Sequence, residues 1–233
     1  METEILHRIK RFFKTRQFTR LDDDAYIKAY AQDSDRRISS NPQKGIGGMW
    51  DEMGELQFDF LKAQGLLPSH TLLDIGCGTL RGGRMFIPYL EEGHYTGFDV
   101  SRRAIDAAED LCRREGLLFH KPRLLHVPEG RLDFSFLSDR YDFLLAQSVF
   151  SHLREPHISE CFDNIRNIMT KESRFFFTFY EANSPHVLGY KSFAYSFDSL
   201  KQMATDSEFV LSRHPEYAHP RGQVMIEARP AES

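Results

Sequence analysis

The sequence predicts an α/β fold with a seven-stranded, mainly parallel sheet, an antiparallel last strand and helices on both faces. From residue 71 onward, short apolar runs alternate with longer helical stretches, which is the pattern of right-handed strand–helix–strand units. The last two apolar runs are joined by only about ten residues, too few for a helical crossover. These two strands are therefore expected to pair antiparallel.

The elements follow in order along the chain. A helix is expected over residues 51–64, where Gly65 and Pro68 stop it. The seven apolar runs expected to form strands are residues 71–75, 94–99, 123–127, 141–147, 174–180, 208–213 and 223–228. Helices are expected between them at residues 81–91, 101–115, 156–170 and 197–204.

The start of the chain is expected to be an appendage. Ile5, Leu6, Ile9, Phe12 and Phe13 recur at helical spacing among basic residues, which predicts a basic amphipathic helix. Within residues 1–20, such a helix can dock on the protein or make peripheral contact with an anionic membrane. From residue 33 to 48 the composition is polar without periodicity, which predicts a connector. We therefore predict an N-terminal helix and linker over residues 1–45 and one domain over residues 46–233.

Composition limits the classes of protein and of partner. The chain of 233 residues has 30 basic and 34 acidic side chains and no run of about 18 apolar residues that could span a membrane. Its three cysteines form no Cys-x-x-Cys pair and its first residues do not resemble a signal sequence, so we expect a cytoplasmic protein with reduced thiols. The first 20 residues carry a net charge of +4, which leaves −8 for the rest. A body this acidic lacks the basic surface of a nucleic-acid-binding domain.

A glycine-containing turn carries the main functional signal. The first predicted strand ends in Asp74-Ile75-Gly76-Cys77-Gly78, and the helix that follows opens near Gly82. Glycines at such a junction let the backbone turn sharply and approach a ligand closely. Asp99 ends the next predicted strand, 21 residues after Gly78, where a carboxylate can accept hydrogen bonds from both ribose hydroxyls. The pattern predicts a site for a nucleoside cofactor.

Two cofactor classes use this geometry. Nicotinamide-binding folds require G-x-G-x-x-G, but Arg81 stands at the third glycine position. Asp74, two residues before Gly76, suits the cationic end of S-adenosylmethionine better than a pyrophosphate. An NAD(P)-dependent oxidoreductase and a non-catalytic protein that binds S-adenosylmethionine remain the alternatives.

At these residues the chain resembles the class I S-adenosylmethionine-dependent methyltransferases, over about residues 45–230. The matching elements are the Asp74 to Gly78 turn, Asp99, the strand Tyr141-Asp142-Phe143-Leu144-Leu145 and the closing antiparallel pair. The resemblance implies a Rossmann-like sheet, S-adenosylmethionine as cofactor and S-adenosylhomocysteine as product. The third glycine of the family's G-x-G-x-G is Leu80 here, which bears on the packing over the methionine moiety.

Three more segments are similar to those of a loosely characterised bacterial subgroup of this family, to which no substrate can be attached. They are Gly47-Gly48-Met49-Trp50, Leu80-Arg81-Gly82-Gly83 and His219-Pro220-Arg221-Gly222-Gln223. Arg221 could orient an anionic acceptor or pair with the acidic surface.

The resemblance implies a set of cofactor contacts. The family places a residue after the third strand against the adenine, and Asp133 and Phe134 are the candidates. Gln147, at the tip of the fourth strand, is expected beside the transferable methyl group. The expected cofactor-binding residues are Asp74, Gly76, Cys77, Gly78, Leu80, Asp99, Val100, Asp133, Phe134 and Gln147.

His152, Tyr180 and Glu181 are the catalytic candidates. Methyl transfer is an in-line displacement, so the enzyme must position the acceptor and remove a proton from it. His152 follows the fourth strand and could remove that proton, or it could merely open the next helix. Tyr180 and Glu181 follow the fifth strand and could line the acceptor pocket.

Two features that the sequence lacks limit the chemical class of the methyl acceptor. Ala146-Gln147-Ser148-Val149 stands where family members that methylate nucleobases or glutamine carry Asp/Asn-Pro-Pro-Tyr. No acidic cluster follows the fourth strand, so no metal is expected. We expect an oxygen or nitrogen acceptor on a small molecule, or on a glycan-like or lipid-linked molecule, and no nucleic acid; the oligomeric state stays open.

Overall fold

A mixed sheet forms the centre of the computed structural model, which describes residue 15 and residues 18–231. Five parallel strands lie in the order β3-β2-β1-β4-β5, and β9 continues the sheet antiparallel to both β5 and β8. Their bounds are β1 (Leu72–Ile75), β2 (Tyr95–Asp99), β3 (Arg123–His126), β4 (Tyr141–Ala146), β5 (Met169–Glu181), β8 (Phe209–His214) and β9 (Val224–Pro230). The predicted fold class, with its seven strands and antiparallel last strand, is confirmed.

A short hairpin extends the sheet beyond the seven predicted strands. β6 (His186–Gly189) pairs antiparallel with β7 (Ser192–Tyr195), and β7 pairs with the end of β5 through Tyr180 and Glu181. The sequence does not predict this hairpin because Val187 and Leu188 in β6 are exposed and show no alternation with polar residues. The hairpin stands at the carboxyl end of β5, beside the edge where the site lies.

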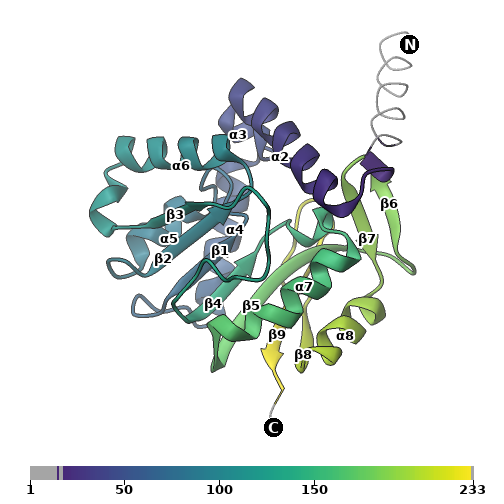
Figure 1. Ribbon diagram of the computed structural model, residues 1–233. Helices are drawn as coiled ribbons and strands as arrows, with labels where there is room; N and C mark the ends of the chain where they lie inside the picture. The colour runs from purple at the N-terminus through teal and green to yellow at the C-terminus, as the bar shows by residue number, and fades with distance from the viewer. Residues whose placement is uncertain (1–14, 16–17, 232–233) are drawn as a thin grey trace.

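Helices cover both faces of the sheet (Figure 1). The apolar faces of α4 (Trp50–Ala63), α5 (Gly83–Tyr89) and α6 (Arg102–Arg114) pack on one side. On the other side lie α7 (Glu155–Ile165) and α8 (Phe197–Asp206). The predicted helix over residues 156–170 is too long, because β5 already begins at Met169.

Alternating side chains of the strands divide the core in two. Phe175 and Phe177 of β5 face α7 and α8, whereas Phe176 between them faces the α4 side. All three rings are fully buried. This period of two is what a sheet covered on both faces requires.

Residues 33–48 do not form the predicted polar connector without periodicity, because helices occupy most of them. α2 (Asp23–Ser40) covers the first of these residues, and α3 (Pro42–Gly45) follows with Asn41 as its N-cap. In Figure 1, α2 lies across the carboxyl edge of the sheet, between α6 and the β6–β7 hairpin. Sequence periodicity misses α2 because several of its polar side chains face other elements of the protein instead of water.

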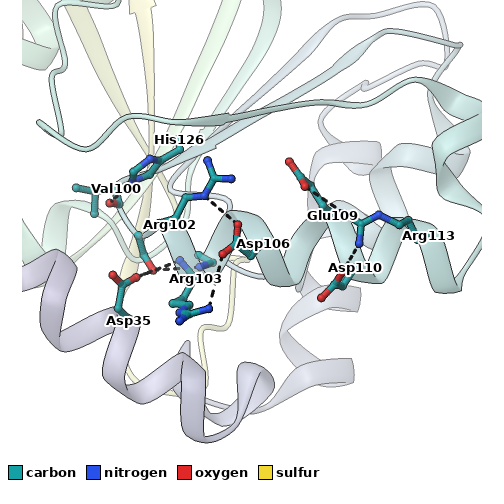
Figure 2. A network of polar contacts seen from close by, with 11 residues as sticks. Asp35, Val100, Arg102, Arg103, Asp106, Glu109, Asp110, Arg113 and His126 are labelled. Atoms are coloured by element: carbon teal, nitrogen blue, oxygen red, sulfur yellow. Dashed lines mark hydrogen bonds and ion pairs between the residues drawn. The ribbon is translucent and has the colours of Figure 1, made fainter.

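Asp35 is one of these polar contacts. Its Oδ1 accepts hydrogen bonds from the Ser101 hydroxyl at 2.5 Å and from the Arg103 N–H at 3.1 Å, at the start of α6 (Figure 2). A carboxylate is well placed at a helix N-terminus, where backbone N–H groups lack partners. α2 is thereby fixed beside the end of β2.

The predicted boundary near residue 45 stays a prediction. The predicted basic helix over residues 1–20 lies almost entirely outside the described residues, so its docking partner stays a prediction too. None of the described helices combines the length and apolar character that crossing a membrane requires.

Candidate active site

A cavity of about 510 Å³ lies at the carboxyl ends of the parallel strands. The strand order reverses between β1 and β4, which is where α/β sheets of this kind bind ligands. The cavity is lined by the ends of β1, β2, β4 and β5, by α2 and α4, and by the turn of the β6–β7 hairpin. Its volume falls in the range of small-molecule sites.

The turn after β1 is built from residues with left-handed backbone. Gly76 has φ 70° and Gly78 has φ 57°. A Cβ on Gly76 would stand 2.7 Å from Val149 Cγ2, and one on Gly78 would stand 3.2 Å from Ile46 Cγ2. Both glycines are therefore needed for conformation and for space.

Leu80 takes the third position of this turn. Its φ of 68° is the left-handed conformation that a glycine adopts without strain. The Leu80 side chain is fully buried in the α4-side core, so hydrophobic burial offsets a backbone strain of about 1–2 kcal/mol. The departure from glycine thus keeps the backbone path but points the side chain into the core.

Asp99 ties the end of β2 to this turn. Its two carboxylate oxygens accept the Gly78 N–H at 3.0 Å and the Ser101 N–H at 2.8 Å. A carboxylate has about four lone-pair positions, so two remain for further donors from the cavity. Burial raises the pKa of Asp99 to about 6, despite the two N–H donors.

Asp74 lies deeper, at the end of β1. It is buried and accepts a hydrogen bond from the Tyr95 hydroxyl at 2.7 Å. Burial raises the pKa of Asp74 to about 6, and the nearby Asp99 carboxylate raises it as well, against the effect of the Tyr95 donor. The two carboxylates give the cavity floor a negative potential that favours a cationic ligand group.

His152 is held in one tautomer beyond the tip of β4. Its Nδ1 lies 2.6 Å from the Lys191 carbonyl oxygen, which can only accept, so Nδ1 donates. Burial lowers the pKa of His152 to about 4, so the ring is neutral at neutral pH and its Nε2 carries a free lone pair. This geometry suits a proton acceptor.

Gln147, also at the tip of β4, is oriented by a neighbour. Its Oε1 accepts a hydrogen bond from the Tyr217 hydroxyl at 2.8 Å, and its Nε2 donates to the Ser148 hydroxyl at 3.2 Å. Tyr217 belongs to the loop between β8 and β9, so this loop closes over the tip of β4.

Most of the predicted site residues meet in the cavity, and four do not. The lining contains Asp74, Gly76, Cys77, Gly78, Asp99, Val100, Gln147, His152 and Tyr180. The residues placed outside it are Leu80, Asp133, Phe134 and Glu181. Among these, Phe134 is a core side chain and Asp133 accepts from the N–H and hydroxyl of Ser135 in an exposed turn. Glu181 binds Arg213 through both of its oxygens, at 2.7 and 2.6 Å.

Cys77 lines the cavity as a small buried side chain. Burial raises the pKa of its thiol well above the usual range, so it is protonated and a poor nucleophile. Within residues 18–231, no group of three or more His, Cys, Asp and Glu side chains is placed to hold a metal ion.

The roof of the cavity is the part that sequence reasoning missed. Tyr30 of α2 and Lys191 of the hairpin turn both line it. The Lys191 ammonium lies 2.9 Å from the Asp33 carboxylate, and both side chains are buried. The Tyr26 hydroxyl donates to the His152 carbonyl at 2.7 Å. The spacing of Tyr26 and Tyr30, four residues apart, is the one signal that could have indicated this helix face.

Known methyltransferases share this architecture. The family model described as a methyltransferase domain matches residues 73–175, from β1 into β5. The magnesium protoporphyrin IX methyltransferase ChlM of Synechocystis PCC 6803, solved with S-adenosylmethionine bound, is 16% identical, with a TM-score of 0.67 over 91% of this chain and 98% of that one.

Two further solved structures are similar. The CcbJ methyltransferase of Streptomyces caelestis is 14% identical, with a TM-score of 0.66 over 86% of this chain and 98% of that one. The glycopeptide N-methyltransferase MtfA, in complex with S-adenosylmethionine, is 12% identical, with a TM-score of 0.62 over 76% of this chain and 94% of that one. Together with the family model, which identifies residues 73–175 as a methyltransferase domain, they show that this chain has the fold of class I S-adenosylmethionine-dependent methyltransferases.

Proposed function

We propose that the protein transfers the methyl group of S-adenosylmethionine to an oxygen or nitrogen of a small molecule, or of a glycan-like or lipid-linked acceptor. The observation that carries the proposal is His152, held in the wall of the cavity as a neutral imidazole with its Nδ1 on the Lys191 carbonyl. Two of the similar structures are named for methylation of magnesium protoporphyrin and of a glycopeptide nitrogen. These names support an acceptor that is a small molecule or a modified, glycan-like one. Three unpaired, buried cysteines suit a location in the cytoplasm.

The residues present fit the cofactor. The free lone pairs of Asp99 would accept hydrogen bonds from the ribose hydroxyls. Asp74 would face the cationic amino-acid end, beside the turn whose path Gly76 and Gly78 allow because a Cβ at either would crowd Val149 or Ile46. An NAD-type pyrophosphate would instead lie at the glycine turn beside the Asp74 carboxylate, which disfavours the oxidoreductase alternative.

His152 would act on the acceptor. The bound cofactor supplies a methyl group on a sulfonium, which is already a good electrophile. The acceptor O–H or N–H would donate to Nε2 of His152, so that its proton moves to the imidazole as the new bond to carbon forms. Tyr180, also in the cavity wall, would position the acceptor, and the Lys191 carbonyl keeps Nδ1 protonated throughout.

The variant His152→Asn tests this role. Asparagine can still donate to the Lys191 carbonyl but has no equivalent of Nε2. We expect kcat to fall by roughly 10²- to 10⁴-fold, the usual contribution of a general base, with S-adenosylhomocysteine affinity little changed. The readout is transfer of labelled methyl into a metabolite extract, then kinetics on the acceptor found. His186→Asn is the matched control, because His186 is exposed on β6, outside the cavity. Transfer by His152→Asn at the control rate would contradict the assignment.

Cofactor affinity should depend on pH through the floor carboxylates. Both have a pKa raised to about 6, so they protonate as the pH falls through 6. Ribose hydroxyls bind the ionised carboxylate, so S-adenosylhomocysteine affinity should be constant above about pH 7. Protonation of Asp99 alone should lower this affinity roughly tenfold by pH 5. Calorimetry between pH 5 and 8 measures this, with Asp99→Asn expected to show a smaller pH dependence. Equal wild-type affinity at pH 5 and pH 8 would refute the prediction.

A further inference from the structure

Three segments that lie far apart in the sequence meet at one end of the cavity. Nη1 of Arg81, in the turn before α5, donates to the Gly48 carbonyl at 3.0 Å. Nη2 of Arg221, in the loop between β8 and β9, donates to the Gly47 carbonyl. The two guanidinium groups thus bind neighbouring carbonyls of one turn, and His219 lies beside them. Arg81, His219 and Arg221 all line the cavity, and we call them the basic corner.

The charges of the basic corner are not neutralised by the protein. Among residues 18–231, the side chains of Arg81 and Arg221 donate to backbone carbonyls, and neither forms an ion pair with a carboxylate. Burial and the neighbouring Arg221 both lower the pKa of Arg81, which marks two like charges held close together. Asp74 is the acid that acts on Arg81, but it lies beyond ion-pair distance. Two adjacent cations in a partly dry cavity are favourable only when an anion joins them.

Two hydrogen-bond donors of the basic corner that lack a partner among the described residues also favour an anionic ligand there. His219 is 8% exposed, and its Nδ1 accepts the Arg221 N–H at 3.0 Å. Burial lowers the pKa of His219 to about 4, so the ring is neutral and Nε2 carries the hydrogen. That Nε2 and the Nε of Arg81 are both buried with no hydrogen-bond partner among the described residues. A buried donor without a partner costs about 1–3 kcal/mol, so an acceptor from a ligand is expected at each.

We propose that the basic corner is a subsite for a carboxylate. The planar fork of arginine can donate two hydrogen bonds to the two oxygens of this group, and the His219 N–H can donate another from a different direction. The inference rests on the proposed function, because the carboxylate must enter with a ligand of the methyl-transfer site. It can be the amino-acid carboxylate of the cofactor or a carboxylate of the acceptor.

Calorimetry distinguishes the two sources. The ligands are S-adenosylhomocysteine and 5′-methylthioadenosine, which has the same nucleoside thioether without the amino-acid end. If the cofactor supplies the carboxylate, Arg81→Gln/Arg221→Gln should weaken S-adenosylhomocysteine by roughly tenfold or more and leave 5′-methylthioadenosine unchanged. If the acceptor supplies it, S-adenosylhomocysteine affinity stays unchanged, and acetate titrated into the S-adenosylhomocysteine-saturated wild type binds but is lost in the variant.

Controls keep these outcomes separate. Arg213→Gln removes an arginine outside the cavity and should match the wild type in every titration. If the double variant unfolds, Arg221→Gln alone replaces it, because this substitution changes an exposed side chain. It should show a weaker form of the same effect. Equal binding of all three ligands by wild type and variants overturns the basic corner but not the proposed function. Failure of the wild type to bind S-adenosylhomocysteine overturns the proposed function itself.

Discussion

Asp99→Ala is expected to weaken S-adenosylhomocysteine binding by about 100-fold or more. Hydrogen bonds to a charged group contribute about 1.5–3 kcal/mol each, and two ribose hydroxyls would lose theirs. The substitution also removes the acceptor of the Gly78 and Ser101 N–H groups, so the turn after β1 loses its tie to β2. Calorimetry on the purified variant measures the effect.

Asp106→Ala is the matched control for this variant. Asp106 lies seven residues further along, on the exposed face of α6, where it pairs with Arg102 at 2.9 Å (Figure 2). Its loss should leave affinity unchanged. If Asp99→Ala bound S-adenosylhomocysteine as tightly as Asp106→Ala does, the ribose assignment would be refuted.

Asp33→Ala is expected to destabilise the protein by about 3–5 kcal/mol, because the buried Lys191 ammonium would lose its carboxylate. For a chain of this size, that lowers the melting temperature by roughly 6–20 °C. Thermal and urea unfolding measure the change. Asp106→Ala again serves as the comparison, since an exposed pair contributes at most about 1 kcal/mol.

A double variant separates the charge effect from lost packing. Asp33→Leu with Lys191→Met replaces the ion pair by apolar side chains of similar length, which is often neutral or stabilising for buried pairs. We expect it to recover most of the stability lost in Asp33→Ala. If the single variant melted like the wild type, α2 would not be held to the hairpin by this pair, and the roof of the cavity would need another explanation.

The strands and the glycine turn could be predicted because local sequence determines them. Apolar runs bounded by turn residues identify buried parallel strands, and Gly76 and Asp99 stand at strand ends that the topology brings together. α2 could not be predicted in this way. Asp33 and Asp35 indicate a solvated connector until Lys191 and the start of α6, far away in the sequence, are placed beside them.

The predicted site residues that lie outside the cavity have a similar cause. Phe134 and Glu181 follow strands at plausible positions, but one side chain turns into the core and the other is held by Arg213. Conversely, Arg81 and His219 stood in segments that resemble a known subgroup, without any indication of a shared location. Only the fold shows that they meet at one end of the cavity.

The most direct test that this cavity binds S-adenosylmethionine is calorimetry. The wild-type protein is titrated once with S-adenosylhomocysteine and once with NAD⁺. The cavity with Asp74 and Asp99 at its floor should bind S-adenosylhomocysteine saturably at one site per chain and give no heat with NAD⁺. Binding of NAD⁺ without binding of S-adenosylhomocysteine would contradict the account of this site.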